Sequence, residues 1–438
     1  MRRWFICTLV GAVTFGSLGG CNGKDAGVLQ SKEGKPSKEV EMKGTINIFS
    51  NSGDNDEGFN DRFGNYIKKK FPELQINYIK RPKLGNVEEL LTAGQEIDLI
   101  WDSIGYFMDT TIPYNLNYDM SQLIEQHNID LSKYDSTIVN AMKQMSNGSM
   151  YGVPIIAQSL VTYYNKDLFD KFGITYPKDG MTWDEQIELG KNLNRLENGV
   201  NYLGHASSTV HIARMNQFSL PFIDLKTGKS AINTEQWKKF YQKTFIDVAQ
   251  QDSYKAWYAS HKVNEVPGVT DFTKSRNLAM YVYLSGYHSS PDLKDMNWDM
   301  VSAPTWKELP GVGPQLYPWY FAIASISKNK DKAMEVIKFL LSDEYQTAIS
   351  KQGYIPASTE QKIREVYGQD APTKGKNLKA VLVNKPAPIS QKHVYDLKID
   401  TIMLKDISNV VMGKSELNTK FRQAEEESNK ILDSLAKK

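Results

Sequence analysis

The first stretch of regular structure along the chain follows a repeating order of apolar and polar positions. Ile46 and Ile48 alternate with polar residues, which indicates a strand. Apolar residues then recur at helical spacing, and a short apolar run is typical of a strand buried on both faces. The predicted elements are a strand over 45–49, a helix over 59–67, a strand over 76–79, a helix from Asn86 to Thr92 and a strand over 97–101. This β-α-β-α-β order predicts a doubly wound α/β lobe.

Later segments also predict a strand followed by a helix. A strand is predicted over 318–324 and an amphipathic helix over 333–341. Thr182 and Glu185 have the spacing of a helix capping box, and we expect Trp183 between them to be a packing residue. In the tail, one helical stripe is expected to pack on the core rather than on a membrane or a partner. It consists of Leu417, Phe421, Ala424, Ser428, Ile431 and Leu435.

The N-terminus predicts export and anchoring. Arg2 and Arg3 precede an apolar stretch over 4–18, which is shorter than the roughly 20 residues of a membrane span and suits a signal peptide over 1–20. The residues before Cys21 resemble a bacterial lipobox, so we expect acyl chains such as palmitate at Cys21, a flexible tether over 21–43, and a lipid-anchored protein on the extracytoplasmic face of the cell membrane. The alternative is an ordinary secretory signal with an incidental cysteine.

Composition excludes several classes of function. The chain has two cysteines, and Cys7 lies in the predicted signal peptide, so no internal disulfide, cysteine metal site or thiol nucleophile is expected. Fifty-three basic residues face 51 acidic ones, and this balance predicts no nucleic-acid partner. The length of 438 residues implies two or more domains.

No catalytic or cofactor motif stands out. The chain has neither H-E-x-x-H nor G-x-S-x-G, and the P-loop-like endings at 228–230 and 413–415 lack the required upstream glycine. We therefore predict no enzyme activity, no cofactor and no metal. The 8 tryptophans and 23 tyrosines suit sugar recognition instead, because aromatic rings pack on the apolar face of a pyranose while amides and carboxylates bind its hydroxyls.

The most specific motif lies over 151–185. It reads Tyr-Gly-Val-Pro, then Tyr-Asn-Lys-Asp-Leu-Phe from Tyr164, then Phe-Gly-Ile, and ends in Thr-Trp-Asp-Glu. This order resembles the signature of family 1 extracellular solute-binding proteins, the sugar receptors of ABC importers. Residues 353–357 resemble the last crossover of that family.

The resemblance implies a two-lobed α/β fold, each lobe a doubly wound sheet flanked by helices, with a ligand cleft between the lobes. Lobe 1 would comprise 44–156 plus 304–356, and lobe 2 would comprise 157–303 plus 357–438. Hinges are expected near 155–158, 302–304 and 356–359. The implied protein is a monomer that captures a carbohydrate, most consistent with an oligosaccharide, and delivers it to ABC transporter permease subunits.

Candidate ligand-binding residues follow from the same resemblance and from the abundance of tryptophan and tyrosine residues. They would come from both walls of the cleft, with an amide at the hinge where the family often has a carboxylate. The predicted residues are Asn51, Asp54, Asp102, Ser103, Gln158, Tyr283, Tyr287, Trp319, Tyr320 and Tyr395.

Three alternatives stay open at this point. The same fold could bind a solute other than a sugar. A surface glycoside hydrolase would need two carboxylates across one cleft, and Asp54 and Asp102 could form such a pair. A structural or sensory surface protein would show no stabilisation by a ligand.

Overall fold

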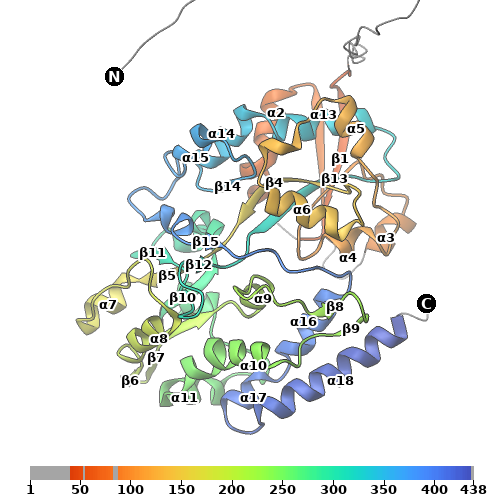
Figure 1. Cartoon of the computed structure of the whole chain (residues 1–438). Coiled ribbons are helices and arrows are strands. Elements are labelled where there is room, and N and C mark those ends of the chain that lie inside the picture. The colour runs from red at the N-terminus through yellow and green to blue at the C-terminus, as the bar shows by residue number, and fades with distance from the viewer. Residues whose placement is uncertain (1–39, 53–54, 82–86, 436–438) are drawn as a thin grey trace, which may run out of the picture. The chain divides into compact units, whose positions relative to one another are not determined.

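Two β-sheets organise the part of the chain that the computed structural model describes, residues 40–52, 55–81 and 87–435 (Figure 1). The first sheet has six strands in the order β14-β4-β13-β3-β1-β2. β1 pairs in parallel with β2 and β3, and the remaining pairs are antiparallel. The strands are β1 (Gly44–Ser50), β2 (Leu74–Lys80), β3 (Leu99–Ser103), β4 (Val153–Gln158), β13 (Tyr317–Ile323) and β14 (Ile355–Pro356).

The second sheet has five strands in the order β11-β5-β10-β7-β6. Only the β10–β7 pair is parallel. Its strands are β5 (Leu160–Asn165), β6 (Arg195–Glu197), β7 (Val200–Ser207), β10 (Leu278–Leu284) and β11 (Trp298–Ser302). Two further pairs join β8 (Ile223–Asp224) to β9 (Lys229–Ser230) and β12 (Val312–Gly313) to β15 (Lys385–Pro386). Both sheets belong to one compact unit, Glu39–Lys438.

Helices flank both sheets, as the α/β pattern predicts. Around the first sheet lie α1 (Asp56–Phe59), the π-helical turn η1 (Asn60–Gly64), α2 (Asn65–Lys70), α3 (Val87–Thr92), α4 (Phe107–Thr111), α5 (Ser121–Gln126), η2 (Leu131–Lys133), α6 (Ser136–Met145), α13 (Lys330–Leu340), α14 (Asp343–Lys351) and α15 (Gln361–Glu365). The predicted strands and helices over 45–101 are confirmed by β1, the continuous helix from α1 to α2, β2, α3 and β3, and Ile46, Ile48 and Trp101 are fully buried as expected. The predicted cap at Asn86 lies outside the described residues.

The helices of the second sheet include the C-terminal ones, since α16 contacts α9 and α18 contacts β9 and α10. They are α7 (Lys166–Phe172), α8 (Trp183–Lys191), α9 (Thr209–Arg214), α10 (Glu235–Tyr241), η3 (Gln242–Ile246), η4 (Asp247–Ala249), α11 (Asp252–Ser260), α12 (Val269–Thr273), η5 (Ser285–Ser289), η6 (Pro291–Leu293), η7 (Leu378–Leu382), α16 (Asp396–Leu404), α17 (Ile407–Val411) and α18 (Leu417–Leu435). In α18, Phe421, Ala424 and Ser428 of the predicted stripe are buried. No helix in the described ranges has the length and apolar character needed to cross a membrane.

The predicted capping box begins α8. The hydroxyl of Thr182 accepts from the main-chain N–H of Glu185, whose carboxylate accepts in return from the N–H of Thr182. Trp183 is buried, and its indole N–H donates to Gln217, so its packing role is confirmed.

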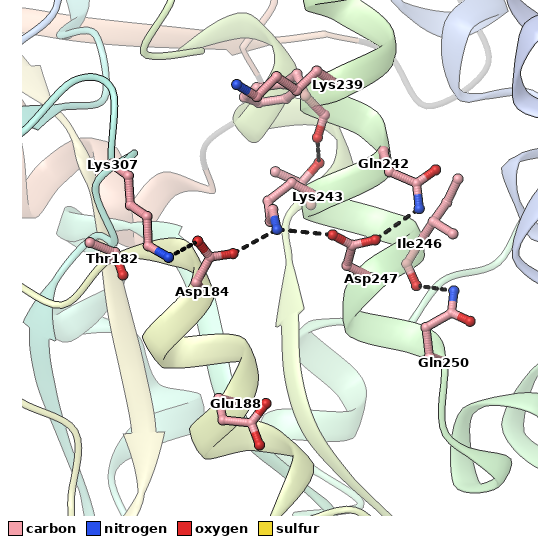
Figure 2. A network of polar contacts seen from close by, with 12 residues as sticks. Thr182, Asp184, Glu188, Lys239, Gln242, Lys243, Ile246, Asp247, Gln250 and Lys307 are labelled. Carbon is pink, nitrogen blue, oxygen red and sulfur yellow. Dashed lines mark hydrogen bonds and ion pairs between the residues drawn. The ribbon is translucent and has the colours of Figure 1, made fainter.

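A network of ion pairs ties α8 to η3 and to the loop after β11 (Figure 2). Lys243 lies between Asp184 at 2.6 Å and Asp247 at 3.0 Å, and Lys307 reaches Asp184 at 3.0 Å. Hydrogen bonds from Lys243 and Lys307 lower the pKa of Asp184. Because these groups are partly exposed, the network fixes helix positions more than it adds stability.

Candidate ligand-binding site

A large cavity has a volume of about 870 Å³ and is lined by elements of both sheets. The first sheet contributes the helix at 55–66, the end of β4, Trp319 of β13 and Tyr354. The second sheet contributes the end of β10 and the turn η5. Its volume lies within the range of about 300–1,000 Å³ that is typical of small-molecule sites.

One face of the first helix lines this cavity, and the opposite face packs in the core. The lining positions recur at intervals of three or four residues, at 58, then 61 and 62, then 65 and 66, as expected of one side of a helix. The lining residues of this face are Gly58, Asp61, Arg62, Asn65 and Tyr66. The residues of the opposite face are Phe59, Phe63 and Ile67, all buried. Only the apolar stripe was predicted from the sequence, although the polar residues recur with the same period.

Arg62 is the one cation among the residues that line this cavity. Its side chain is held between aromatic rings, with the guanidinium carbon 4.3 Å from the ring centre of Trp319 and 5.8 Å from that of Tyr354. Arg62 is 8% exposed, and this burial lowers the pKa of its guanidinium below the ordinary value. Trp319, which is 7% exposed, presents its ring to Arg62 and also lines the cavity, and its role in ligand binding stays a prediction.

Gln158, Tyr283 and Tyr287 also line the cavity. Together with Trp319, four of the predicted residues therefore meet there. Oε1 of Gln158 accepts a hydrogen bond from the main chain of Gly286 at 3.1 Å. The ring of Tyr287 lies edge-on to Tyr283, with centres 5.0 Å apart. Burial raises the pKa of Tyr287 to about 12, so its hydroxyl is protonated at neutral pH.

Asp102 holds the loop after β1 in place. Its Oδ1 accepts from the main-chain N–H groups of Asn51 at 3.0 Å and Ser52 at 2.7 Å, and from the hydroxyl of Ser50 at 3.2 Å. Burial raises the pKa of Asp102 to about 6, although these hydrogen bonds favour the carboxylate. The buried Asp102 and Asn51 lie at the carboxyl ends of β3 and β1, where polar groups were predicted, but neither lines the large cavity.

The remaining predicted residues lie outside the lining of that cavity. Ser103 donates to the hydroxyl of Tyr317 at 3.2 Å. Tyr320 is fully buried, and its hydroxyl donates to the carbonyl of Ile138 at 2.8 Å. Tyr395 is half-buried at the start of α16, and Asp54 is outside the described residues. The ligand-binding role of these residues, and of Asn51 and Asp102, stays a prediction.

A second, much smaller hollow of about 20 Å³ lies among buried charges. This volume suits about one water molecule. Nε of Arg214 donates to Asp400 at 2.7 Å, and the lining includes Lys392 and Asp396. Burial alone would lower the pKa of Arg214, but the carboxylate of Asp400 raises it above the usual value. Across the described ranges no group of three histidine, cysteine or acidic side chains could hold a metal ion.

Comparison with known proteins identifies the family. The bacterial extracellular solute-binding proteins match this chain over residues 55–347. The chain belongs to this family. A similar relative is the sn-glycerol-3-phosphate-binding periplasmic protein UgpB of Brucella melitensis, 25% identical over 334 residues that cover 69% of this chain and 72% of the relative. The mannitol-binding protein of Pseudomonas aeruginosa is 23% identical over 60% of this chain and 58% of its own length.

Solved structures of solute-binding proteins share the fold of this one. The substrate-binding protein Lmo0181 of Listeria monocytogenes, in complex with cycloalternan, has a TM-score of 0.71 at 18% identity and covers 89% of this chain and 99% of its own. UgpB of Mycobacterium tuberculosis, in complex with glycerophosphocholine, has a TM-score of 0.68 at 17% identity, covering 90% and 100%. The predicted fold class and family are thereby confirmed for this solute-binding protein.

Proposed function

We propose that this protein captures a carbohydrate in the large cavity, as the ligand receptor of an ABC importer. The observation that carries the proposal is the lining itself, in which aromatic rings from both sheets lie with amide, carboxylate and guanidinium groups from the first sheet and with hydroxyls from the second. Rings suit the apolar face of a pyranose, and polar groups suit its hydroxyls. The mannitol and cycloalternan named for similar proteins support a polyhydroxylated ligand.

Capture would work by closure of two lobes about the cavity. The proposed lobes are 44–156 plus 304–356 and 157–303 plus 357–438, with hinges near 155–158, 302–304 and 356–359. A ligand that contacts both walls at once binds the closed form better, and only such a differential affinity can shift the population toward closure. The closed form would then dock on the permease subunits as a monomer.

The proposal also includes the place where the protein works. A lipid on Cys21 would anchor the protein on the extracytoplasmic face of the membrane, and two or more acyl chains suffice for stable anchoring. Membrane fractionation of a Cys21→Ala variant tests this point, since retention of the variant in the membrane fraction would contradict it. Ligand binding without catalysis is proposed for the cavity.

A second candidate ligand is a phosphorylated polyol. Relatives named for sn-glycerol-3-phosphate and the cationic Arg62 in the lining favour it, whereas the two carboxylates of Glu57 and Asp61 in the same lining oppose it. A thermal-denaturation screen with maltotriose, cycloalternan, D-mannitol and sn-glycerol 3-phosphate separates these candidates. A ligand at one hundred times its Kd should stabilise the protein by about 2.7 kcal/mol. Stabilisation by none of the four would contradict the proposed function.

A further inference from the structure

The contact between Gln158 and Gly286 fixes the direction of an amide in the cavity wall. The main-chain N–H of Gly286 donates to Oε1 of Gln158 at 3.1 Å. Of the two ends of a carboxamide, only the oxygen can accept a hydrogen bond from an N–H group. The oxygen of Gln158 is therefore turned toward Gly286, and the NH2 group is the end that remains for another partner.

Within the ranges that the structure describes, the NH2 group of Gln158 has no acceptor. Among the residues that the structure describes, no carbonyl, carboxylate or hydroxyl accepts from Nε2, although Gln158 is only 3% exposed. A nearly buried donor is stabilised when an acceptor reaches it. Because Gln158 lines the large cavity, a bound ligand is the natural source of that acceptor.

We propose that Gly286 sets the polarity of Gln158, so that Gln158 recognises an acceptor oxygen of the ligand through Nε2. This inference rests on the proposed function, because it assigns a role within the same cavity. A hydroxyl, a glycosidic oxygen or a carbonyl oxygen can accept from Nε2, whereas an ammonium group can only donate and is excluded from this position. Gln158 is then a specificity-determining residue and Gly286 a positioning residue.

The space around Gly286 explains why a glycine stands there. A Cβ atom at this position would lie 2.8 Å from Oε1 of Gln158 and 3.0 Å from Cε1 of Tyr354. The turn cannot easily retreat, because the N–H of Ser285 donates to the carbonyl of Ser159 at 2.8 Å. A side chain at 286 would therefore displace the amide of Gln158 or the ring of Tyr354 and break the contact that orients the amide.

Amide hydrogen exchange tests the orientation without any ligand. The N–H of Gly286 should exchange slowly in the wild type and in Gln158→Glu, which keeps an oxygen acceptor, and faster in Gln158→Leu, which has none. Equal exchange rates in the wild type and Gln158→Leu would overturn the proposed contact. This result does not depend on the identity of the ligand.

Titration calorimetry with the same four probes tests the donor role. Gln158→Leu removes the donor and supplies no acceptor, so each probe that the wild type binds should bind at least about tenfold more weakly. Gln158→Glu at pH 8 offers only an acceptor, so it should bind a probe whose contacting oxygen carries no proton as weakly as Gln158→Leu does, whereas a contacting hydroxyl can turn its O–H toward the carboxylate. For a proton-less oxygen, acidification protonates the introduced carboxyl and restores a donor, so the affinity of Gln158→Glu should recover as the pH falls while that of Gln158→Leu does not. Wild-type affinity of Gln158→Leu would overturn the proposal.

Gly268 provides a matched control for the need for a glycine at position 286. At Gly268 a Cβ atom would meet its nearest neighbours at 3.7 Å, an ordinary contact distance. We expect Gly286→Ala to weaken binding and to speed exchange at position 286, and Gly268→Ala to behave as the wild type in both. Wild-type behaviour of Gly286→Ala would overturn the positioning role. If no probe binds the wild type, the proposed function fails for this panel, and the exchange experiment still decides the polarity of Gln158.

Discussion

Arg62 and Trp319 form a cation–π contact at the wall of the cavity. Trp319 was predicted to bind the ligand, and the guanidinium of Arg62 lies 4.3 Å from the centre of its ring. The indole thus supports a cation at the cavity wall, and cation–π contact with a nearly buried ring contributes about 1–2 kcal/mol. Arg62 was not predicted, because one arginine in a helix carries no local signal of its own.

We predict that Arg62→Met weakens ligand binding by about 2 kcal/mol, roughly thirtyfold, since a hydrogen bond from a charged donor contributes about 1.5–3 kcal/mol. Methionine keeps an apolar stem against the ring, so the fold should persist. Calorimetry with a probe found in the thermal screen measures the loss. The control is Arg422→Met, because Arg422 is exposed and pairs with Glu426 on α18. Equal affinities of the two variants would count against a binding role for Arg62.

Asp102 gives a prediction that needs no ligand. Its pKa rises from 3.8 to about 6 in the folded protein because of burial, so the folded state binds the proton more tightly than the unfolded state. The contribution of Asp102 to stability is therefore fully present below pH 4 and falls by about 3 kcal/mol as the pH rises through 6.

Asp102→Asn removes this titration. The difference in free energy of unfolding between the wild type and this variant should change by about 2 kcal/mol from pH 4 to pH 7, with the wild type relatively more stable in acid. Urea denaturation at four pH values measures it. A difference that is independent of pH would show that the carboxyl of Asp102 keeps an ordinary pKa.

At the scale of elements, the sequence predicted those features that depend on residues close together in the chain. The capping box at Thr182, the strand over 45–49 and the buried stripe of α18 depend on neighbours in sequence or on one periodic face, and all three are present. The cavity depends on residues far apart in sequence. Gly286 meets Gln158 only because β10 pairs with β5 and the chain runs directly from β4 into β5, which no short motif encodes.

We predict that Thr182→Ala destabilises the protein by about 1 kcal/mol, since it removes the acceptor that caps α8. Thr182→Ser keeps the hydroxyl and should retain most of the stability. Chemical denaturation of both variants measures the effect. Equal loss of stability in the two variants would show that the methyl group of Thr182, rather than its capping hydroxyl, stabilises the protein.

At the scale of the whole molecule, one wall of the cavity comes from the first helix and β13, and the other from the turn after β10. The contact of Gly286 with Gln158 and that of Ser289 with Tyr354, at 2.9 Å, join these walls. Family membership and fold are consistent with an arrangement that binds a solute between two sheets. The sequence could indicate this arrangement through its family motif, but which side chains face the solute follows only from the packing.

The most direct test of carbohydrate capture is a calorimetric titration of the intact protein with maltotriose and cycloalternan, followed by chromatography of the recovered ligand. The account predicts reversible one-to-one binding to the wild type, weaker binding to Arg62→Met, and recovery of the sugar unaltered. Absence of binding to both sugars, or recovery of shortened sugar, would contradict it.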